Sequence, residues 1–406
     1  MLDALSALKY RLISSLSPRA ARRRPATTPH LLEVHNRPAA GATAHRPDMA
    51  PPRPPKPDPL QRFALPSGHI QVLVPLMQKY RRLLDSQYAM PLQDRDERRA
   101  IESFFTTRAQ LVDAALGDPA QALGVRRPWP DLSPPSSHGR LLERLFQCSN
   151  GLVIGENHAA QGSKRLLIDH MAELRSLGVT TLYLEHLQSD LHQGDLDRLR
   201  VSGTLSPALE RFLDSQDMGH NTHAASGATF RALVQAAADA GIRIVALDLM
   251  ASYHLGGAQG TAGLDSLELR IKVMNHVAAQ RIQHDQRQQR ASAPVQRWVA
   301  LVGDAHAGDF NDTVGLGERL GVPSLRVEDI SPSFSQRVRV GCDPVRTVPG
   351  SLGRSDGTVQ CDYLLQVPAR DGRARESTPG PCSAAEALRQ HDQHQARYTS
   401  ARVRTA

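Results

Sequence analysis

A short apolar run that ends in polar residues stands at residues 152–158, which read LVIGENH. The pattern recurs at residues 182–186 (LYLEH), 242–248 (IRIVALD) and 298–306 (WVALVGDAH). Segments with apolar residues at helical spacing lie between these runs. Continuous apolar strands that alternate with helices are typical of a parallel sheet with helices on both faces. The sequence therefore predicts an α/β domain over residues 141–368, with a mostly parallel sheet flanked by helices.

The segments outside this domain have a different character. Apolar residues recur at helical spacing in residues 68–117, so we expect a small helical subdomain over residues 61–140. Residues 1–60 hold 11 of the 28 prolines and many arginines, which predicts a disordered leader. Residues 369–406 are expected to form a flexible tail.

Two smaller features are also predicted from local patterns. The acidic stretch from Asp94 to Glu97 is typical of a helix start. Residues 337–340 and 362–367 are separated by glycines and a proline, and we expect them to pair as a hairpin near the end of the α/β domain.

The first sixteen residues carry leucines at helical spacing, followed by arginines. They lack the apolar core and the cleavage site of a secretory signal peptide. Three interpretations stay open: a frayed amphipathic end, a weak membrane-surface anchor, or the unstructured address of proteins that bacteria export by contact-dependent secretion.

The formal net charge of +8 is concentrated at the two ends of the chain. Residues 1–60 carry ten basic and four acidic residues, and residues 369–406 carry seven and four. Residues 61–368 have a net charge of −1, so the body of the chain lacks the positive charge that nucleic-acid phosphates attract. We expect no specific nucleic-acid partner, although the basic tails could contact an acidic surface such as a membrane.

Several classes of protein are disfavoured by what the sequence lacks. There is no run of about eighteen uncharged apolar residues, so no helix is predicted to span a membrane. The four cysteines are widely spaced without a Cys-x-x-Cys pair, which predicts neither a zinc cluster nor a redox motif; a disulfide between Cys342 and Cys361 stays open. The absence of a Gly-x-Ser-x-Gly elbow and of a phosphate-binding glycine loop disfavours serine hydrolases and P-loop enzymes.

Polar residues that follow the predicted strands form a list of site candidates, because ligands of an open parallel sheet bind at the carboxyl ends of its strands. The candidates are Glu156, Asn157, His158, Glu185, His186, Asp248, Asp304, His306, Glu328 and Asp329. Since the preceding strand residues are apolar, we expect these titratable groups to gather at one edge of the sheet.

The motif Gly-x-x-His occurs twice, from Gly155 to His158 and from Gly303 to His306. Each glycine would let the backbone turn at the strand end, which aims both histidines at one point beside Glu185. His158, Glu185 and His306 match an open three-ligand metal site for a divalent ion or a water-activating acid–base cluster. Glu156 would be the second carboxylate and the general base. The alternative is that these histidines cap helices or satisfy backbone groups.

Other candidates support the site or line it. Neighbouring side chains of a straight strand point to opposite faces, so if Glu185 faces the site, His186 is expected either behind it or at the site through a bend in the strand. Asp248 could orient a histidine or cap the loop before Tyr253, and Asp304 is expected to support His306. Tyr253 and its neighbour His254 could line the pocket.

The remaining polar candidates have less specific surroundings. His220 and His223 lie in a polar loop, where a solvated loop is favoured over a lid. Arg270 could clamp an anionic group, but a surface ion pair is the commoner outcome. The mid-helix residues His170, His276 and His284 are expected on the surface or in packing contacts.

The motifs GENH (155–158), LYLEH (182–186) and GDAH (303–306), in this order, resemble the superfamily that joins erythromycin esterases, ChaN-like haem-binding proteins and the Tiki/TraB metal-dependent peptidases. The resemblance covers residues 148–332. It implies that the paired motif of the superfamily falls on His158 and His306 and its acidic position on Glu185, with Glu156 as the second carboxylate. Erythromycin esterases have one more residue between the acid and the histidine of the first motif, so antibiotic-ester cleavage is not implied.

One branch of the superfamily is most similar to this chain. The stretches LEHL (184–187) and DLH (190–192), together with ALD (246–248) and ASYHL (251–255), resemble the branch found in bacterial toxins and effectors with a membrane-targeting module. This resemblance implies a secreted virulence protein that is translocated into a host cell, which the proline-rich leader would fit.

The function expected from the sequence is thus that of a translocated effector with a hydrolase-like domain, either an esterase or a metallopeptidase-like enzyme. One alternative is a module that binds haem or another ligand without turnover, with Tyr183 or Tyr253 as an axial ligand. Another is a virulence protein whose helical subdomain docks on a membrane or a partner. The substrate, the metal and the host target stay open.

Overall fold

The structure is a computed structural model that describes residues 57–79, 94–121, 129–130, 132, 137–220, 222, 226–253, 266–290, 296–330, 340–343, 345–348 and 357–369. The predictions for most of the leader, for the tail after residue 369, and for His223 and His254 fall outside these residues.

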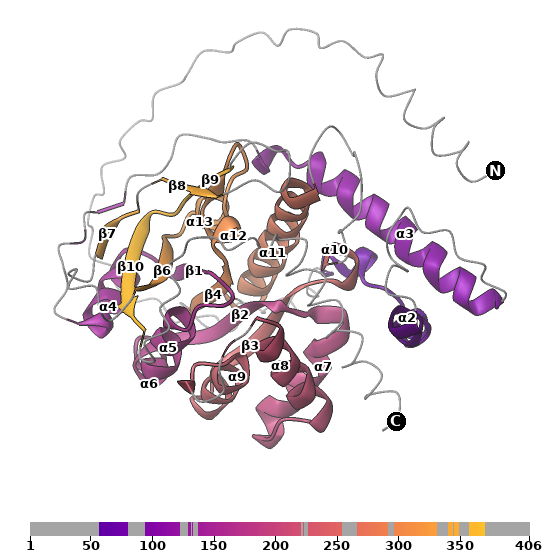
Figure 1. The fold of residues 1–406 in the computed structure, drawn as a ribbon, viewed down its shortest axis with the longest axis horizontal. Coiled ribbons are helices and arrows are strands. Elements are labelled where there is room, and N and C mark those ends of the chain that lie inside the picture. Colours follow the sequence, from indigo (N-terminus) through magenta and orange to yellow (C-terminus); the bar gives the residue numbers. More distant parts are fainter. Residues whose placement is uncertain are drawn as a thin grey trace, which may run out of the picture. The chain divides into compact units, whose positions relative to one another are not determined.

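A seven-stranded sheet with the strand order β3-β2-β4-β1-β6-β10-β7 forms the centre of the described chain (Figure 1). Neighbouring strands are parallel except at the edge, where β7 runs antiparallel to β10. The predicted α/β class with a mostly parallel sheet is therefore confirmed. The strands are β1 (Gly151–Glu156), β2 (Val179–Gln188), β3 (Arg243–Asp248), β4 (Arg297–Gly303), β6 (Ser324–Ile330), β7 (Val340–Cys342) and β10 (Tyr363–Pro368).

Helices cover both faces of this sheet, which explains why its strands are apolar at successive positions. Leu152, Ile154 and Leu184 point to one face and pack against α4 to α9. Val153 and Tyr183 point to the other face and pack against α11. In Figure 1, α5 to α9 lie below the sheet, and α11, α12 and α13 lie above it. The helices of the two faces are α4 (His138–Cys148), α5 (Gly162–Asp169), α6 (Met171–Ser176), α7 (Ser189–Ser202), α8 (Pro207–Gly219), α9 (Phe230–Asp239), α11 (Ser266–Arg290), α12 (Asp304–Ala307) and α13 (Leu316–Leu320).

The predicted helical segment contains two main helices, α2 (Ser67–Lys79) and α3 (Arg95–Leu116), with short 3-10 turns at Gln61–Phe63 and Pro119–Gln121. Asp94 caps α3 by accepting hydrogen bonds from the backbone N–H groups of Asp96 and Glu97, so the predicted helix start is confirmed. The buried cluster of α2 and α3 includes Phe104 and continues into Met250 of α10 (Met250–Tyr253). The apolar residues of this segment therefore pack against the α/β core.

A second, three-stranded sheet has the order β5-β9-β8. Its strands are β5 (Asp309–Phe310), β8 (Arg346–Val348) and β9 (Gly357–Gln360). The pairing of β7 with β10 places Cys342 opposite Tyr363, close to the predicted hairpin, but β8 and β9 lie between the two strands in the sequence. Cys342 is an exposed free thiol and Cys361 a buried one, so they form no disulfide.

No helix in the described part of the chain has both the length and the apolar character that crossing a membrane requires.

Candidate functional site

The carboxyl ends of three neighbouring strands bring together both predicted carboxylates and both Gly-x-x-His motifs. Glu156 ends β1, Glu185 lies near the end of β2, and α12 follows β4 directly and carries His306. Because β4 lies between β1 and β2, the residues that follow it lie between the two carboxylates. Glu156, Glu185 and His306 are only 1%, 5% and 7% exposed, so their charges interact in a water-poor environment.

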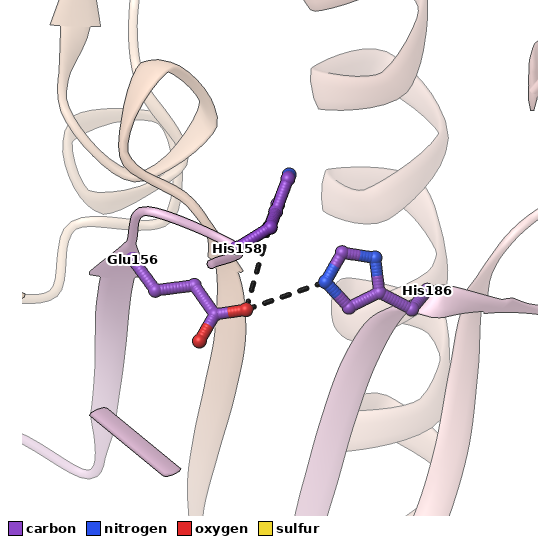
Figure 2. Close-up of side chains that lie close together, drawn as sticks. All are labelled: Glu156, His158 and His186. Carbon is purple, nitrogen blue, oxygen red and sulfur yellow. Dashed lines mark hydrogen bonds and ion pairs between the residues drawn. The ribbon is translucent and has the colours of Figure 1, made fainter. Parts of the chain in front are cut away.

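Glu156 is the centre of one half of the site. Its Oε1 lies 3.3 Å from Nδ1 of His158 and 3.3 Å from Nε2 of His186. Dashed lines mark both contacts in Figure 2. Its Oε2 accepts a hydrogen bond of 2.5 Å from the Ser163 hydroxyl and one of 3.0 Å from the Lys164 ammonium. Both carboxylate oxygens are thus fully used by neighbouring side chains.

Lys164 is a site residue that the sequence interpretation did not include. Its buried ammonium donates to Oε2 of Glu156 and to the backbone carbonyls of His158 (3.1 Å) and Ala160 (2.9 Å). Three N–H donors therefore meet three acceptors, and Lys164 fixes both Glu156 and the loop that carries His158. A sequence signal existed, since the chain has only 5 lysines against 44 arginines and this one stands eight residues after Glu156.

Glu185 is the centre of the other half. Its Oε2 accepts a hydrogen bond of 2.7 Å from the backbone N–H of Gly303, and its Oε1 lies 3.2 Å from Nε2 of His306. The guanidinium of Arg270 lies 3.5 Å from Oε1 of Glu185 and 2.6 Å from Asp248. Arg270 is 4% exposed, so the surface ion pair expected for it is wrong and it forms a buried one.

His158 connects the two halves across Gly303. A Cβ atom at position 303 would lie 3.2 Å from Nε2 of His158 and 3.5 Å from Oε2 of Glu185. Both side chains therefore pack against the backbone of Gly303. The backbone of Gly303 has φ −59° and ψ 148°, which other residues adopt readily. Gly303 is therefore required for space, and the predicted role in a sharp turn is wrong for this position.

Gly155 is explained in the same way. A Cβ atom there would lie 2.9 Å from Cβ of Ala307 and 3.1 Å from Cα of Asp304. The glycine lets α12, which carries His306, pack closely on β1, and it does not act through a turn.

Glu185 and His186 lie on opposite faces of the sheet, as alternation along a strand predicts. Glu185 faces Arg270 of α11, whereas the ring of His186 packs 4.3 Å from that of Phe230 of α9. His186 nevertheless reaches the site, because Glu156 at the end of β1 is within hydrogen-bonding distance of it.

His220 also belongs to the site, which the favoured interpretation as a solvated loop residue did not predict. Its ring lies 5.1 Å from the rings of both His158 and His186 and 5.8 Å from that of Phe230. The polar composition of the loop does not predict the position of His220, because His220 is brought to the site by the packing of the end of α8 against α9.

The electrostatics of the site keep both carboxylates ionised. Burial raises the pKa of Glu156, but the Lys164 ammonium and the hydrogen bonds from His158 and His186 outweigh this and hold the pKa well below its usual value. Burial likewise raises the pKa of Glu185, and the charges of His306, His158 and Arg270 outweigh it, so this pKa is also well below its usual value.

The three clustered imidazoles differ in their affinity for a proton. Burial lowers the pKa of His158, but the hydrogen bond to Glu156 and the charge of Glu185 outweigh it, so the pKa is raised. Burial and the neighbouring His158 lower the pKa of His186 to about 4. Burial, His186 and His158 hold the pKa of His220 well below its usual value. His158 is therefore the most basic imidazole of this cluster.

The remaining predicted residues lie around the site with other partners. Asp248 accepts hydrogen bonds from the backbone of Leu249 and from Ser252, besides binding Arg270, so it caps a loop and orients an arginine, not a histidine. Asp304 forms an ion pair with Arg346. This contact ties α12 to β8.

The two tyrosines considered as haem ligands are occupied elsewhere. Tyr183 is fully buried, donates a hydrogen bond of 2.5 Å to Asp285 and accepts one of 3.0 Å from Gln286. Tyr253 is 5% exposed and packs under the guanidinium of Arg270, 5.3 Å from the ring centre. Of the mid-helix histidines, His276 is buried and its Nδ1 lies 2.8 Å from a carboxylate oxygen of Asp118, within hydrogen-bonding distance.

Glu156, His158 and His186 form a group that could hold a metal ion, because one ligand atom of each lies within 4.8 Å of the others. The group shares only His158 with the predicted ligands His158, Glu185 and His306. Its chemistry does not fit a resident divalent cation. The Lys164 ammonium already neutralises Glu156 from 3.0 Å and would repel a cation.

Comparison with known proteins relates the chain to a bacterial toxin. A stretch of 190 residues, 46% of the chain, is 31% identical to the multifunctional-autoprocessing repeats-in-toxin protein of Vibrio vulnificus. The match spans 3% of the length of that toxin. No protein-family model matches the chain. The predicted kinship with bacterial toxins and effectors is thus supported, while membership of the Tiki/TraB and ChaN-like superfamily stays a prediction.

Several solved structures of bacterial virulence proteins have weak similarity to the chain. RRSP, a MARTX toxin effector domain from Vibrio vulnificus, is 23% identical with a TM-score of 0.38, and the match covers 64% of this chain and 44% of that one. The type III effector HopBA1 is 14% identical with a TM-score of 0.37, over 59% and 97%. The C-terminal region of Pasteurella multocida toxin, described with a thiol-protease-like catalytic triad, is 12% identical with a TM-score of 0.39, over 68% and 34%. These TM-scores are too low to support a conclusion about this chain.

Proposed function

We propose that this chain is a bacterial effector whose α/β domain hydrolyses an ester or amide bond in a host-cell molecule. The observation that carries the proposal is the meeting of two Glu–His pairs, Glu156 with His158 and Glu185 with His306, at the ends of three adjacent strands. Clustered titratable groups whose pKa values are shifted in opposite directions are typical of acid–base sites. The similarity to a toxin supports the effector part of the proposal.

His158 activates water in this proposal. Its Nδ1–H donates to the ionised Glu156, which orients the ring and leaves Nε2 as the basic atom beside Glu185. A water molecule transfers a proton to Nε2 while its oxygen bonds to the carbonyl carbon of the substrate. Glu156 therefore acts through His158 and not directly on water, which revises the general-base role predicted for it.

The second pair completes the reaction. As the bond between the carbonyl carbon and the leaving oxygen or nitrogen breaks, the leaving atom takes a proton held between His306 and Glu185. The products are a carboxylic acid and an alcohol or amine. The proton on His158 then returns to the second pair through solvent, which restores the starting state.

This mechanism uses no resident metal ion, because Lys164 and Arg270 already supply positive charge to the two carboxylates. A haem-binding module receives no support from the positions of Tyr183 and Tyr253. A Soret band that forms on adding haem and is lost in Tyr253→Phe would nevertheless favour that alternative.

Translocation into a host cell and contact of the basic ends with an acidic surface, such as a membrane, are part of the proposal. Docking through α2 and α3 is not, because the apolar residues Phe104 and Leu111 of α3 are fully buried against the rest of the chain. The host target is left to experiment.

Expression of the full chain in yeast tests the effector function without knowledge of the substrate. The wild-type chain should stop growth, and Glu185→Gln and His306→Gln should abolish this effect at equal protein levels. His284→Gln is a matched control, because His284 lies on α11 and contacts only Gln288 among the described hydrogen bonds. Full toxicity of His306→Gln would defeat the catalytic claim.

Hydrolysis by the purified chain tests the chemistry. Panels of nitrophenyl esters and fluorogenic peptides should show turnover that survives treatment with a chelator and falls at least about 100-fold in His306→Gln. Activity that is lost with the chelator and restored by Zn²⁺ would show that the site is a metal centre instead.

A further inference from the structure

Asn275 is a buried polar residue in an apolar part of α11. It is 0% exposed, as are its helix neighbours Met274, Val277 and Ala278. Burying an amide in such surroundings is unfavourable unless its donor and acceptor are both used. The side chain has two partners: Nδ2 donates to the backbone carbonyl of Val314 at 3.0 Å, and Oδ1 lies 2.9 Å from Nδ1 of His306.

The Val314 contact fixes which way the amide points. A backbone carbonyl can only accept a hydrogen bond, so the amide nitrogen of Asn275 must face Val314. The opposite orientation would place two oxygen acceptors 3.0 Å apart without a hydrogen between them. The amide oxygen therefore faces His306, and because it too can only accept, Nδ1 of His306 must carry a hydrogen.

We infer that Asn275 is a positioning residue that keeps Nδ1 of His306 protonated. With Nδ1 protonated, the other ring nitrogen, Nε2, is directed at Oε1 of Glu185, 3.2 Å away. Both of these atoms would be acceptors if neither carried a proton, so the contact requires one proton between them. Asn275 thereby makes the His306–Glu185 pair hold a transferable proton at Nε2.

This inference rests on the proposed hydrolase function for its catalytic consequence. A leaving oxygen or nitrogen needs a proton, and the pair that Asn275 prepares holds one. The two histidines thus have different partners at Nδ1: the carboxylate of Glu156 for His158 and the neutral amide of Asn275 for His306. The carboxylate of Glu156 makes Nε2 of His158 a stronger proton acceptor. The neutral amide of Asn275 orients the ring of His306 as a proton donor without neutralising the charge of the ring.

Nitrogen-15 NMR of the full chain labelled at histidine tests the tautomer directly, because the shifts of the ring nitrogens report their protonation. The His306 signals are identified by their loss in His306→Gln. We expect a protonated Nδ1 in the wild-type chain. In Asn275→Leu we expect Nδ1 to lose its hydrogen while Nε2 keeps the one that Glu185 accepts, and Asn275→Asp should keep the hydrogen on Nδ1.

The kinetic effect separates positioning from general damage. Asn275→Leu should lower kcat about 100-fold with little change in KM, Asn275→Asp should lower it less because Nδ1 stays protonated, and Met274→Leu is the matched packing control. An unprotonated Nδ1 in the wild-type chain, or a protonated one in folded Asn275→Leu, would overturn the inference. If Asn275→Leu does not fold, the spectra of the wild-type chain and of Asn275→Asp still test the inference, because an unprotonated Nδ1 of His306 in either protein would overturn it.

The outcomes also distinguish this inference from the proposed function. Loss of hydrolysis in His306→Gln with full kcat in Asn275→Leu would overturn the role of Asn275 alone. The expected tautomers without any effect of His306→Gln on hydrolysis would overturn the function and leave the tautomer assignment intact.

Discussion

Gly303 lets His158 and Glu185 approach each other, because any side chain at this position would meet both of them. A Cβ atom would lie 3.1 Å from Cε1 of His158 and 3.2 Å from its Nε2, which is closer than most carbon contacts. The backbone conformation itself accepts alanine.

Gly303→Ala should therefore lower kcat/KM by about 10- to 100-fold, since small displacements of catalytic groups have large kinetic effects. The change in the free energy of unfolding should stay near 1 kcal/mol or less. Kinetics and thermal unfolding of Gly194→Ala serve as the control, because a Cβ there meets only the end of the Arg198 side chain at 3.8 Å. Unchanged kcat/KM in Gly303→Ala would show that the two side chains do not need this approach.

Lys164 is a buried cation whose removal leaves Glu156 charged without its main partner. Breaking a buried ion pair on one side costs about 3–5 kcal/mol, so Lys164→Met should lower the free energy of unfolding by about 3 kcal/mol. Lys164→Arg should also destabilise the chain, because a planar guanidinium cannot replace the three donors of a fully buried ammonium.

The matched control for Lys164 is Lys272→Met, which removes a partly exposed ion pair with Glu268 one helix turn away. Urea unfolding should show a loss below about 1 kcal/mol for this variant. Equal losses for the two lysines would contradict the central role of Lys164.

His186 makes the stability of the chain depend on pH. Its folded-state pKa of about 4 lies below the usual histidine value of 6.5, so the unfolded chain binds a proton more tightly. The stabilisation is present above pH 6.5 and is lost as the pH falls toward 4. Two other buried acids, Asp190 and Asp217, have pKa values raised to about 6 by burial and change the stability in the opposite direction, so the contribution of His186 must be measured as a difference.

We therefore expect the free energy of unfolding of the wild-type chain to fall by up to about 3 kcal/mol relative to that of His186→Gln between pH 7 and pH 4. Urea unfolding of both proteins across this range measures the difference. A constant difference in stability at all pH values would show that His186 is not held neutral in the folded chain.

At the level of elements, α5 and β2 both contribute side chains to the site. The start of α5 delivers Ser163 and Lys164 to Glu156, so the helix that follows β1 completes the site that β1 begins. Alternation along β2 sends Glu185 and His186 to opposite faces. The site therefore extends around the end of the sheet, with helices α9 and α11 on its two sides.

Asp118 connects α3 to the α/β core, and its contribution to the free energy of unfolding can be measured. Asp118, just after α3, pairs with His276 of α11 and with Arg319 of α13 at 2.8 and 2.5 Å. Burial raises the pKa of Asp118, but the hydrogen bonds from Arg319 and His276 outweigh it and lower the pKa to about 2.

Asp118→Asn should lower the free energy of unfolding by about 2 kcal/mol, because the buried Arg319 guanidinium loses its ion pair and His276 loses its carboxylate partner. The exposed Asp113→Asn on the same helix is the control. Thermal unfolding followed both by circular dichroism and by tryptophan fluorescence should show one shared transition. Separate transitions would show that α2 and α3 unfold independently of the sheet.

At the level of the whole molecule, the sheet could be predicted because its strands are apolar on both faces and end in polar residues. The strand-end rule also selected Glu156, His158, Glu185, His186 and His306 for the same reason. Lys164, Asn275 and His220 could not be predicted by it, since they lie on helices or loops and reach the site through packing. Periodicity carries no information about which buried helix residue faces which strand end.

The roles of Gly155 and Gly303 show a second limit of sequence reasoning. A glycine after a strand suggests a turn, but both glycines make room for neighbours that are distant in the sequence. Likewise, Arg270 on α11 was expected at the surface, although its position opposite Asp248 and Glu185 follows only from the packing of α11 on the sheet.

The central claim is that the Glu156–His158 and Glu185–His306 pairs act as one catalytic unit. Its most direct test is the kcat/KM of His158→Gln, of His306→Gln and of the double variant on the best substrate of the ester and peptide panels, with chelator present. We predict that kcat/KM falls at least about 100-fold in each single variant and little further in the double variant, as for residues that act together. Losses that multiply in the double variant, or wild-type turnover in either single variant, would contradict it.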